Sequence, residues 1–255
     1  MALLELRNVN RRFGGLHAVN QVSFDVSKGQ IKAVIGPNGA GKTTLFNLIA
    51  GTLPLSSGTV RFNGSTISGK KPHQIAGLGI CRTFQNIKLF HGMSVLENVM
   101  VGCHLRSRSG FVSGMLSPPR SRREEKWIRQ EALDLLEELH IADLAHLEAD
   151  SLAFGQQRAV EFARALAARP ELLLLDEPAA GLNIYETDEV GAFIGRIRDQ
   201  GITVLLVEHD MSLVMDISDE VLVLSFGEKI AEGTPRDIQA DQEVVRVYLG
   251  EEEHA

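Results

Sequence analysis

The sequence has few cysteines, no long apolar run and no excess of positive charge. Its 255 residues include two cysteines, Cys81 and Cys103, without CxxC spacing, so we expect neither a disulfide framework nor a zinc site. The longest mostly apolar run, 202–207, has six residues, whereas a membrane-spanning helix needs about 20. Because Glu5 also interrupts the short apolar N-terminus, we expect a protein of a reducing compartment with neither a signal peptide nor a membrane span.

The charge balance is acidic, with 26 Lys and Arg residues against 33 Asp and Glu residues. A net charge of -7 weighs against duplex nucleic acid as the main partner, because nucleic-acid binders carry a basic face. One segment differs: residues 104–126 contain six basic residues against two acidic ones, around a Gly-, Ser- and Pro-rich centre. This pattern predicts an exposed loop, which is either a solvated insertion or a contact with phospholipid headgroups or a partner chain.

Short β-rich segments alternate with helical ones, which predicts an α/β fold with a largely parallel sheet. The runs 172–175 and 202–207 are apolar without alternation, as in strands that are buried on both faces. Segments 219–224 and 228–232 flank a Phe-Gly turn and predict a hairpin. Further strands are expected at 3–9, 22–26, 30–35, 58–63 and 80–84, and further helices at 42–50, 156–168 and 243–249.

A helical region interrupts this alternation, because no strand pattern is found between Phe84 and Leu172. Ser94 and Glu97 form a capping box that predicts the start of a helix, and a second helix is expected at 124–140. We therefore expect a single domain over 1–255, with a helical subdomain at 87–154 inserted into a core made of 1–86 and 155–255.

Residues 36–43 match the phosphate-binding pattern G-x-x-x-x-G-K-[ST], and they stand between an expected strand and an expected helix. Glycines allow successive backbone N–H groups to curl around an anion, and the helix N-terminus adds partial positive charge. Lys42 can reach the β- and γ-phosphates, the Thr43 hydroxyl can ligate Mg²⁺, and Thr44 can touch the α-phosphate. The predicted nucleotide-binding residues are Gly36, Pro37, Asn38, Gly39, Ala40, Gly41, Lys42, Thr43 and Thr44.

The apolar run 172–175 ends in two acids, Asp176 and Glu177. This order brings Asp176 beside the phosphate loop, where its carboxylate can hold Mg²⁺ through water, and Glu177 can polarise the attacking water. The phosphate loop alone leaves GTPases, kinases, DNA-repair ATPases and transport ATPases open. The sequence contains no N-K-x-D segment for reading guanine, which weighs against a GTPase.

A further motif, L-A-F-G-Q-Q-R at 152–158, resembles the LSGGQ signature of ABC-type ATPases. The other motifs follow in the order of that family: an aromatic residue, the phosphate loop, a glutamine at a strand end, the signature, the acidic strand, and a histidine after the 202–207 strand. The resemblance covers nearly the whole chain. It implies a P-loop ABC-ATPase fold, in which a mostly parallel RecA-like core carries an antiparallel β subdomain and an inserted helical subdomain.

The resemblance implies ATP and Mg²⁺ as cofactors and assigns their remaining contacts. The nucleotide base would stack on Phe13, which offers few base-specific groups. Gln85 would join Thr43 and Asp176 in holding the Mg²⁺ ion. The roles of Phe13 and Gln85 come from the resemblance and the matching order of motifs, with each residue read at its place in this sequence.

The resemblance also implies how hydrolysis is performed. His209 would contact the γ-phosphate and orient Glu177 and the water, so that Lys42, Glu177 and His209 form the catalytic set. ABC ATPases work as head-to-tail pairs, in which each nucleotide lies between one phosphate loop and the partner's signature segment. A single chain therefore carries a half-built site, and its signature residues would act in trans: Ala153, Phe154, Gly155 and Gln156.

Three residues depart from the family pattern. Ala153 replaces the usual signature Ser, so backbone N–H groups must carry that contact with the γ-phosphate. Phe154 replaces the first signature Gly, as in one branch of importer ATPases, and Asn183 replaces the usual aspartate of the turn after the acidic strand. The Asn183 change is expected to weaken cross-talk between the two sites. None of the three affects the catalytic set, so we expect hydrolysis to survive.

Within the family the chain resembles the LivG-type ATPases of high-affinity branched-chain amino acid importers. The residues that carry this resemblance include Phe13-Gly-Gly-Leu16, the segment 176–183, and the terminal Tyr248-Leu-Gly250. The basic insertion at 104–126 also resembles that subgroup. Related importers of urea or other amides, and a lipopolysaccharide exporter, remain open as alternatives. From a different class, a soluble ABC-type ATPase of translation or DNA repair is disfavoured, because the chain has one ATPase unit and no sustained heptad pattern.

The resemblance implies several partners and no nucleic acid. The second ATPase subunit would be either the same chain or a LivF-like sister, and both would dock on transmembrane permease subunits that receive cargo from a substrate-binding protein. The chain would then be cytoplasmic and peripheral on the inner face of the cell membrane. Residues from Gln85 to Met93 would line the groove for the permease, where Ile87, Leu89 and Phe90 are either an exposed apolar patch or core residues.

Overall fold

The computed structural model describes residues 2–83, 85–103 and 119–249. These residues form two compact units: Met1–Arg82 with Glu171–Ala255, here unit 1, and Thr83–Pro170, here unit 2. Most of the basic segment expected at 104–126 lies outside the described residues, as do Phe84 and Gly250. In the described ranges, no helix has both the length and the apolar character needed to cross a membrane.

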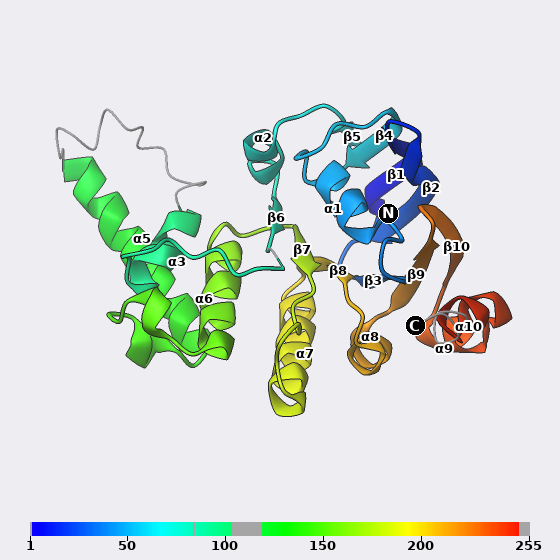
Figure 1. Cartoon of the computed structure of the whole chain (residues 1–255). Helices are drawn as coiled ribbons and strands as arrows, with labels where there is room; N and C mark the ends of the chain where they lie inside the picture. The colour runs from blue at the N-terminus through cyan, green and yellow to red at the C-terminus, as the bar shows by residue number, and fades with distance from the viewer. Residues whose placement is uncertain (1, 84, 104–118, 250–255) are drawn as a thin grey trace. The chain divides into compact units, whose positions relative to one another are not determined.

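Unit 1 contains a six-stranded sheet in the order β10-β9-β3-β8-β7-β6 (Figure 1). Five strands run parallel to one another, and β10 pairs antiparallel with β9 as the expected hairpin. Every residue of β3, β7 and β8 is buried, which confirms the largely parallel α/β core. The strands are β3 Ile31–Ile35, β6 Ile80–Arg82, β7 Leu172–Asp176, β8 Thr203–Val207, β9 Glu220–Ser225 and β10 Glu228–Gly233.

A second, antiparallel sheet in the order β2-β1-β4-β5 completes the strands of unit 1. β1 and β2 are longer than the apolar patterns at 3–9 and 22–26 predicted, because polar residues near the turn still pair through several register shifts. A hydrophobic cluster joins residues of both sheets and of α1. The strands are β1 Ala2–Phe13, β2 Leu16–Ser27, β4 Ser57–Phe62 and β5 Ser65–Thr66.

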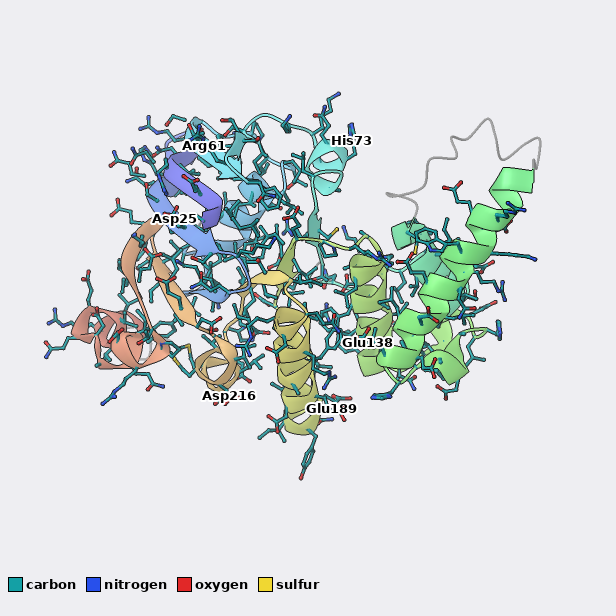
Figure 2. All side chains as sticks on the ribbon, turned by 180° about the vertical axis from the view of Figure 1, so that it is seen from behind. Asp25, Arg61, His73, Glu138, Glu189 and Asp216 are labelled. Atoms are coloured by element: carbon teal, nitrogen blue, oxygen red, sulfur yellow. The ribbon has the colours of Figure 1, made fainter. Side chains whose placement is uncertain are left out.

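The helices of unit 1 follow or precede the strands of the parallel sheet. Glu189 on α7 and Asp216 on α8 are exposed, as expected for the polar side of surface helices (Figure 2). The hydrophobic patterns predicted α1 and α10 but not the four other helices. The helices of unit 1 are α1 Lys42–Ile49, α2 Pro72–Ala76, α7 Ile184–Asp199, α8 Met211–Ile217, α9 Pro235–Ala240 and α10 Gln242–Leu249.

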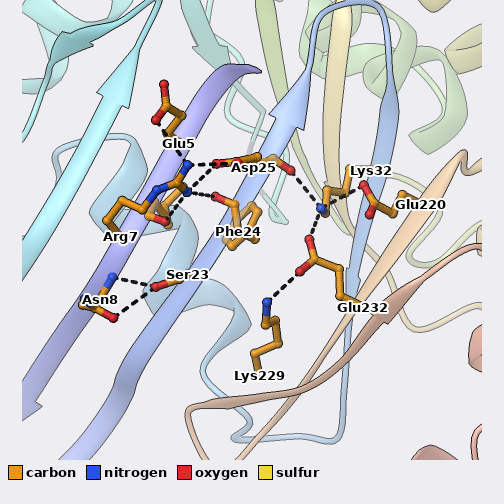
Figure 3. Close-up of polar contacts among 11 residues, drawn as sticks. Glu5, Arg7, Asn8, Ser23, Phe24, Asp25, Lys32, Glu220, Lys229 and Glu232 are labelled. Atoms are coloured by element: carbon orange, nitrogen blue, oxygen red, sulfur yellow. Dashed lines mark hydrogen bonds and ion pairs between the residues drawn. The ribbon is translucent and has the colours of Figure 1, made fainter. Parts of the chain in front are cut away.

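A buried lysine connects the two sheets of unit 1 (Figure 3). Lys32 on β3 is 1% exposed, and its ammonium donates to the backbone oxygen of Asp25 on β2 at 2.8 Å. The same ammonium pairs with Glu220 on β9 at 3.0 Å and with Glu232 on β10, and the Phe24 ring centroid lies 5.3 Å away. Three acceptors thus meet the three ammonium donors, which compensates the buried charge.

The ion pairs around Glu232 predict a pH-dependent contribution to stability. Burial raises the pKa of Glu232, but hydrogen bonds and charges from Lys229 and Lys32 outweigh burial and hold the pKa below its usual value. Stability from such a carboxylate is fully present above its unfolded pKa, about 4.3, and is lost as the pH falls through the lower folded value. We expect Glu232→Gln to lower the free energy of unfolding at neutral pH.

Urea unfolding at neutral and acidic pH measures this effect. The difference between the wild type and Glu232→Gln should shrink as the pH falls below the unfolded pKa, because the wild-type carboxyl also becomes neutral. Glu189→Gln removes an exposed carboxylate from the same unit and serves as the control. A difference that keeps its full size at acidic pH would contradict this role of Glu232.

Unit 2 is helical in its described residues. The capping box before α3 is confirmed: the Glu97 carboxylate accepts from the Ser94 N–H at 2.8 Å, and the Glu97 N–H donates to the Ser94 hydroxyl at 3.2 Å. The Ser94 N–H and the Ser94 hydroxyl, at 2.9 Å, both donate to the Glu97 carboxylate and hold the pKa of Glu97 below its usual value. The elements are α3 Val95–Cys103, α5 Pro119–Glu138, α6 Phe154–Ala167 and the 3₁₀ turns Ala142–Leu144 and Ala149–Ser151.

The boundaries of the helical unit differ from those expected at 87–154. The structure assigns α6 to unit 2, whereas the sequence pattern assigned 155–168 to the core. The reason is the apolar side of α6: Val160, Ala163 and Ala167 are buried in one cluster with residues of α3 and α5. The periodicity of α6 showed an apolar face, but it did not show which neighbours cover that face.

Candidate functional site

The phosphate loop connects β3 to α1 in unit 1, as expected from the motif at 36–43. Gly36, Gly39 and Gly41 have φ angles of 147°, 79° and 101°, a region that side chains strongly disfavour. A Cβ atom on Gly36 would collide with the carbonyl oxygen of Leu224, and one on Gly41 with that of Ala18. Glycine is therefore required at both positions for this loop conformation.

The cation and hydroxyl groups of the motif lie at the N-terminus of α1. Lys42 is 8% exposed, and its ammonium donates to the carbonyl oxygens of Gly36 at 2.5 Å and Pro37 at 3.0 Å. Thr43 is exposed on the first turn of α1, and Thr44 is half-buried beside it. Positive charge from Lys42 and from the helix N-terminus makes this a favourable place for phosphate.

Phe13 lies at the end of β1, in the same unit as the phosphate loop. Its side chain is 43% exposed, and the Arg11 guanidinium lies 4.5 Å from its ring centroid. One face of the ring is thus covered by a cation, as in other cation–π pairs. An exposed aromatic ring held in this way suits stacking with a planar base.

Asp176 ends β7 and is 3% exposed. The Arg82 guanidinium at the end of β6 donates through Nη2 to Asp176 Oδ2 at 2.7 Å and through Nη1 to Asn47 Oδ1 at 2.7 Å. The buried carboxylate is therefore compensated by a fixed cation. Asp176 was expected as a site residue from the sequence, whereas no motif indicated Arg82 or Asn47.

Glu177 follows Asp176 with φ of +50°, an uncommon conformation for a residue other than Gly, Asn or Asp. Its N–H donates to the Val207 carbonyl oxygen at 2.9 Å, which fixes the sharp turn after β7. The carboxylate oxygen Oε2 lies 3.8 Å from His209 Nδ1. Glu177 and His209 are thus brought together, and backbone strain of this kind is often found at functional sites.

Glu208 supports both of these segments. It is 1% exposed, and its carboxylate accepts hydrogen bonds from the N–H groups of Ala179 at 2.8 Å, His209 at 2.9 Å and Asp210 at 3.3 Å. One side chain therefore holds the turn after Glu177 and the start of the histidine segment. Glu208 directly precedes His209 in the sequence, and the motifs assigned no role to it.

These residues fit ATP with Mg²⁺ by the chemistry of their donors. Glycines at positive φ allow successive backbone N–H groups to curl around an anion, and Lys42 supplies the opposite charge. The Thr43 hydroxyl and the Asp176 carboxylate are oxygen ligands, which Mg²⁺ prefers. The side chains of Glu177 and His209 are of the types that general acid–base catalysis uses.

The signature residues form the N-terminus of α6 in unit 2. Ala153 is the residue before the helix, and its N–H donates to Gln156 Oε1 at 3.2 Å. Phe154 is 47% exposed, with the Arg158 guanidinium 5.7 Å from its ring centroid. The first N–H groups of a helix have no acceptor within the helix, so this end can bind an anion without the usual Ser hydroxyl.

Gln85 is exposed and belongs to unit 2. Its backbone oxygen accepts a hydrogen bond from Arg158 Nη2 at 3.2 Å, and Arg158 Nη1 donates to Glu161 Oε2 at 2.9 Å. Both Arg158 and Glu161 side chains are 1% exposed. A buried ion pair on α6 is therefore bonded to the backbone of the predicted Mg²⁺ ligand, a contact that the sequence analysis did not identify.

The segment after Gln85 contains both exposed and packed apolar residues. Phe90 is 47% exposed, and the Arg164 guanidinium lies 5.5 Å from its ring centroid. Ile87 is half-buried, and Leu89 packs partly against the apolar cluster of unit 2. The interpretation as an exposed apolar patch therefore fits Phe90, and the interpretation as a core residue fits Leu89.

Asn183 caps α7, where the family pattern has aspartate. Its Oδ1 accepts from the N–H groups of Tyr185 at 3.0 Å and Glu186 at 3.1 Å, and Glu186 Oε2 accepts from the Asn183 N–H at 2.9 Å. The amide therefore makes the capping bonds that a carboxylate would make. Its effect on cross-talk between sites remains a prediction.

The site residues that the sequence analysis missed share one signal. Arg82 and Glu208 are charged residues at the ends of mostly apolar segments, and Arg158 is the charged residue that ends the signature motif. Fully buried charges require partners, so a charge in such a segment indicates an ion pair or several hydrogen bonds. The partners themselves come from distant parts of the sequence and could not be read from the motifs.

Comparisons with known proteins agree with this geometry. A family model described as ABC transporter matches residues 19–180, and one described as Branched-chain amino acid ATP-binding cassette transporter matches residues 228–254. The fold is similar to a nucleotide-free ATP-binding cassette from an ABC transporter, with a TM-score of 0.84 and 33% identity, covering 97% of this chain and 99% of that chain. The resemblance inferred from the motifs is thereby confirmed.

Curated relatives match over almost the full chain. The high-affinity branched-chain amino acid transport ATP-binding protein BraF of Pseudomonas aeruginosa is 45% identical, covering 98% of both chains. LivG of Escherichia coli, with the same description, is 43% identical over the same shares. The lipopolysaccharide export ATP-binding protein LptB of Escherichia coli is 35% identical over 99% of both chains. The chain therefore belongs to the ABC transporter family, as an ATP-binding and ATP-hydrolysing subunit.

Proposed function

We propose that this chain hydrolyses ATP to energise an importer of branched-chain amino acids. The observation that carries the substrate assignment is the 45% identity, over 98% of the chain, to a branched-chain amino acid transport ATP-binding protein. The separate match at 228–254 supports it, because that segment lies outside the ATPase motifs and includes β10, α9 and α10. The transported amino acid would bind the permease, not this chain.

The chemistry would use groups of unit 1 together with Gln85 of unit 2. Thr43, Gln85 and Asp176 are the residues we propose to hold Mg²⁺, which would neutralise charge on the β- and γ-phosphates when bound. Lys42 binds the same phosphates. Glu177 accepts a proton from the attacking water. At the same time the water oxygen bonds to the γ-phosphorus, and the bond between that phosphorus and the β–γ bridging oxygen breaks.

His209 would complete this arrangement as an orienting group. Its Nδ1 atom lies 3.8 Å from Glu177 Oε2, close enough for a small movement to make a hydrogen bond. Its side chain is 63% exposed, so it can reach a γ-phosphate bound at the surface of unit 1. Phe13 would hold the base by stacking, with little discrimination between adenine and guanine.

We propose a head-to-tail pair as the active form. Each nucleotide would lie between the phosphate loop of one subunit and the signature residues of the other, at the N-terminus of α6. The second subunit is either another copy of this chain or a LivF-like subunit. Hydrolysis would then depend on closure of the pair, and both subunits would dock on permease subunits at the inner face of the cell membrane, supplied by a substrate-binding protein.

A lipopolysaccharide exporter is the second candidate, because LptB is 35% identical over 99% of the chain. The identity to LptB is lower than the 45% identity to BraF, and the match at 228–254 is to a branched-chain amino acid family model. Both findings favour the amino acid importer. Importers of urea or other amides share the same ATPase chemistry and differ in the permease. A role in translation or DNA repair is disfavoured by the acidic charge of -7, since nucleic-acid binders carry basic faces.

Affinity capture of the tagged chain from detergent-solubilised membranes of its host tests this proposal. We expect permease subunits and a second ATPase subunit to co-purify, and leucine with its binding protein to raise the ATPase rate of the complex. Stimulation by lipopolysaccharide in place of leucine would favour the second candidate. Co-purification of ribosomes or DNA without a permease would contradict the transport function.

A further inference from the structure

Arg82 joins the two elements of unit 1 that carry proposed Mg²⁺ ligands. It is the last residue of β6, and its side chain is 8% exposed. Nη2 donates to Asp176 Oδ2 on β7, and Nη1 donates to Asn47 Oδ1 on α1, both at 2.7 Å. The guanidinium also lies 5.8 Å from the ring centroid of Phe46 on α1. Nη1 and Nη2 of Arg82 thus bridge the helix α1 and the strand β7.

The helix end of this bridge is directly related to the phosphate loop. Asn47 follows Thr43 by four residues on α1, so the two side chains lie on the same face of the helix. The Asn47 amide oxygen is also held by the Thr52 hydroxyl at 3.0 Å. Arg82 therefore connects the face of α1 that carries Thr43 to the strand end that carries Asp176.

The planar guanidinium makes this connection rigid. Its donors have fixed relative directions, so an arginine that bonds two oxygen atoms also fixes the distance between them. Lysine carries the same charge as a single point and cannot reproduce both bonds in this geometry. In metal sites, groups that orient the ligands typically contribute 10- to 100-fold to metal affinity.

We propose that Arg82 is a positioning residue for the divalent cation of the nucleotide site. It holds the Asp176 carboxylate at a fixed place relative to Thr43, so that both are ready for the cation that accompanies ATP. This inference rests on the proposed assignment of Thr43 and Asp176 as Mg²⁺ ligands. Arg82 does not touch the nucleotide in this account and acts only through Asp176 and Asn47.

Arg82→Lys tests the proposal, because it keeps the charge and breaks the bridge. Calorimetric titration with the non-hydrolysable nucleotide AMP-PNP, in EDTA and at a series of free Mg²⁺ concentrations, separates phosphate binding from cation binding. We expect AMP-PNP affinity in EDTA to remain at the wild-type value. The free Mg²⁺ concentration that half-maximally tightens binding should rise by about 10- to 100-fold.

Arg198→Lys is the matched control. Arg198 is also an ion-paired arginine of unit 1, with Asp199 at 3.0 Å and Asp219 at 3.6 Å, and it has no contact with Asp176 or Asn47 among the described hydrogen bonds. It should bind AMP-PNP and Mg²⁺ as the wild type does. If Arg82→Lys does not fold, Asn47→Ala removes the helix end of the bridge and should raise the Mg²⁺ requirement in the same direction.

Two outcomes overturn the role of Arg82. One is an unchanged Mg²⁺ requirement in Arg82→Lys or, where that variant does not fold, in Asn47→Ala. The other is an equal loss of AMP-PNP affinity with and without Mg²⁺, which would indicate a structural role only. Asp176→Asn distinguishes failure of the underlying site: if it also keeps the wild-type Mg²⁺ requirement, the proposed cation site is wrong.

Discussion

Glu177→Gln is expected to lower the rate of ATP hydrolysis by about 10²- to 10⁴-fold, the usual contribution of a general base. The amide has nearly the shape of the carboxylate but cannot accept the proton of the attacking water. ATP binding should persist, because the phosphate loop and Lys42 are unchanged. The variant should therefore trap nucleotide-bound pairs, which size-exclusion chromatography with ATP can detect alongside the phosphate-release rate.

Glu189→Gln is the control for this experiment. Glu189 is an exposed carboxylate on α7 of the same unit, and its replacement should leave the hydrolysis rate at the wild-type value (Figure 2). Turnover by Glu177→Gln at the wild-type rate would remove Glu177 from the catalytic set. The Glu177–His209 pair would then have no assigned chemical role.

Arg158→Met is expected to destabilise unit 2 by about 3–5 kcal/mol, the usual cost of removing one partner from a buried ion pair. Arg158 and Glu161 are each 1% exposed, so the variant removes the Arg158 cation from beside a buried carboxylate. The variant also loses the hydrogen bond to the Gln85 backbone. The single tryptophan, Trp127, lies on α5 in unit 2, so its fluorescence in urea reports on this unit.

The double variant Arg158→Met/Glu161→Leu separates charge from packing. Replacing both members of a buried pair by apolar residues is often neutral or stabilising, so most of the lost stability should return. The contact with Gln85 would remain absent, and any residual effect on ATP hydrolysis would be assigned to it. If Arg158→Met were as stable as the wild type, the Arg158–Glu161 ion pair would contribute nothing to the stability of unit 2.

Local patterns predicted most of the strands of the parallel sheet and supplied the residues of the candidate site. The glycine loop, the apolar strand before Asp176, and the capping box at Ser94 and Glu97 are encoded by residues close in sequence. Their backbone requirements are local, so a glycine at a positive φ or a capping side chain can be read directly. The largely parallel sheet followed from apolar runs that need cover on both faces.

The features that the sequence did not predict depend on distant partners. α6 carries an apolar face that suits either unit, and only its neighbours on α3 and α5 decide where it packs. Arg82 is 94 residues from Asp176, and no periodicity links the two. Helices α7 and α8 were also not predicted, because α7 contains two glycines and α8 is only seven residues long.

Uptake of labelled leucine by proteoliposomes is the most direct test of the transport function. The vesicles would contain this chain, its co-purified permease and ATPase partner, and ATP inside, with leucine-loaded binding protein outside. We predict ATP-dependent accumulation of leucine by the wild-type complex and its loss in Glu177→Gln. A complex that hydrolyses ATP but accumulates neither leucine, isoleucine nor valine would contradict branched-chain amino acid import.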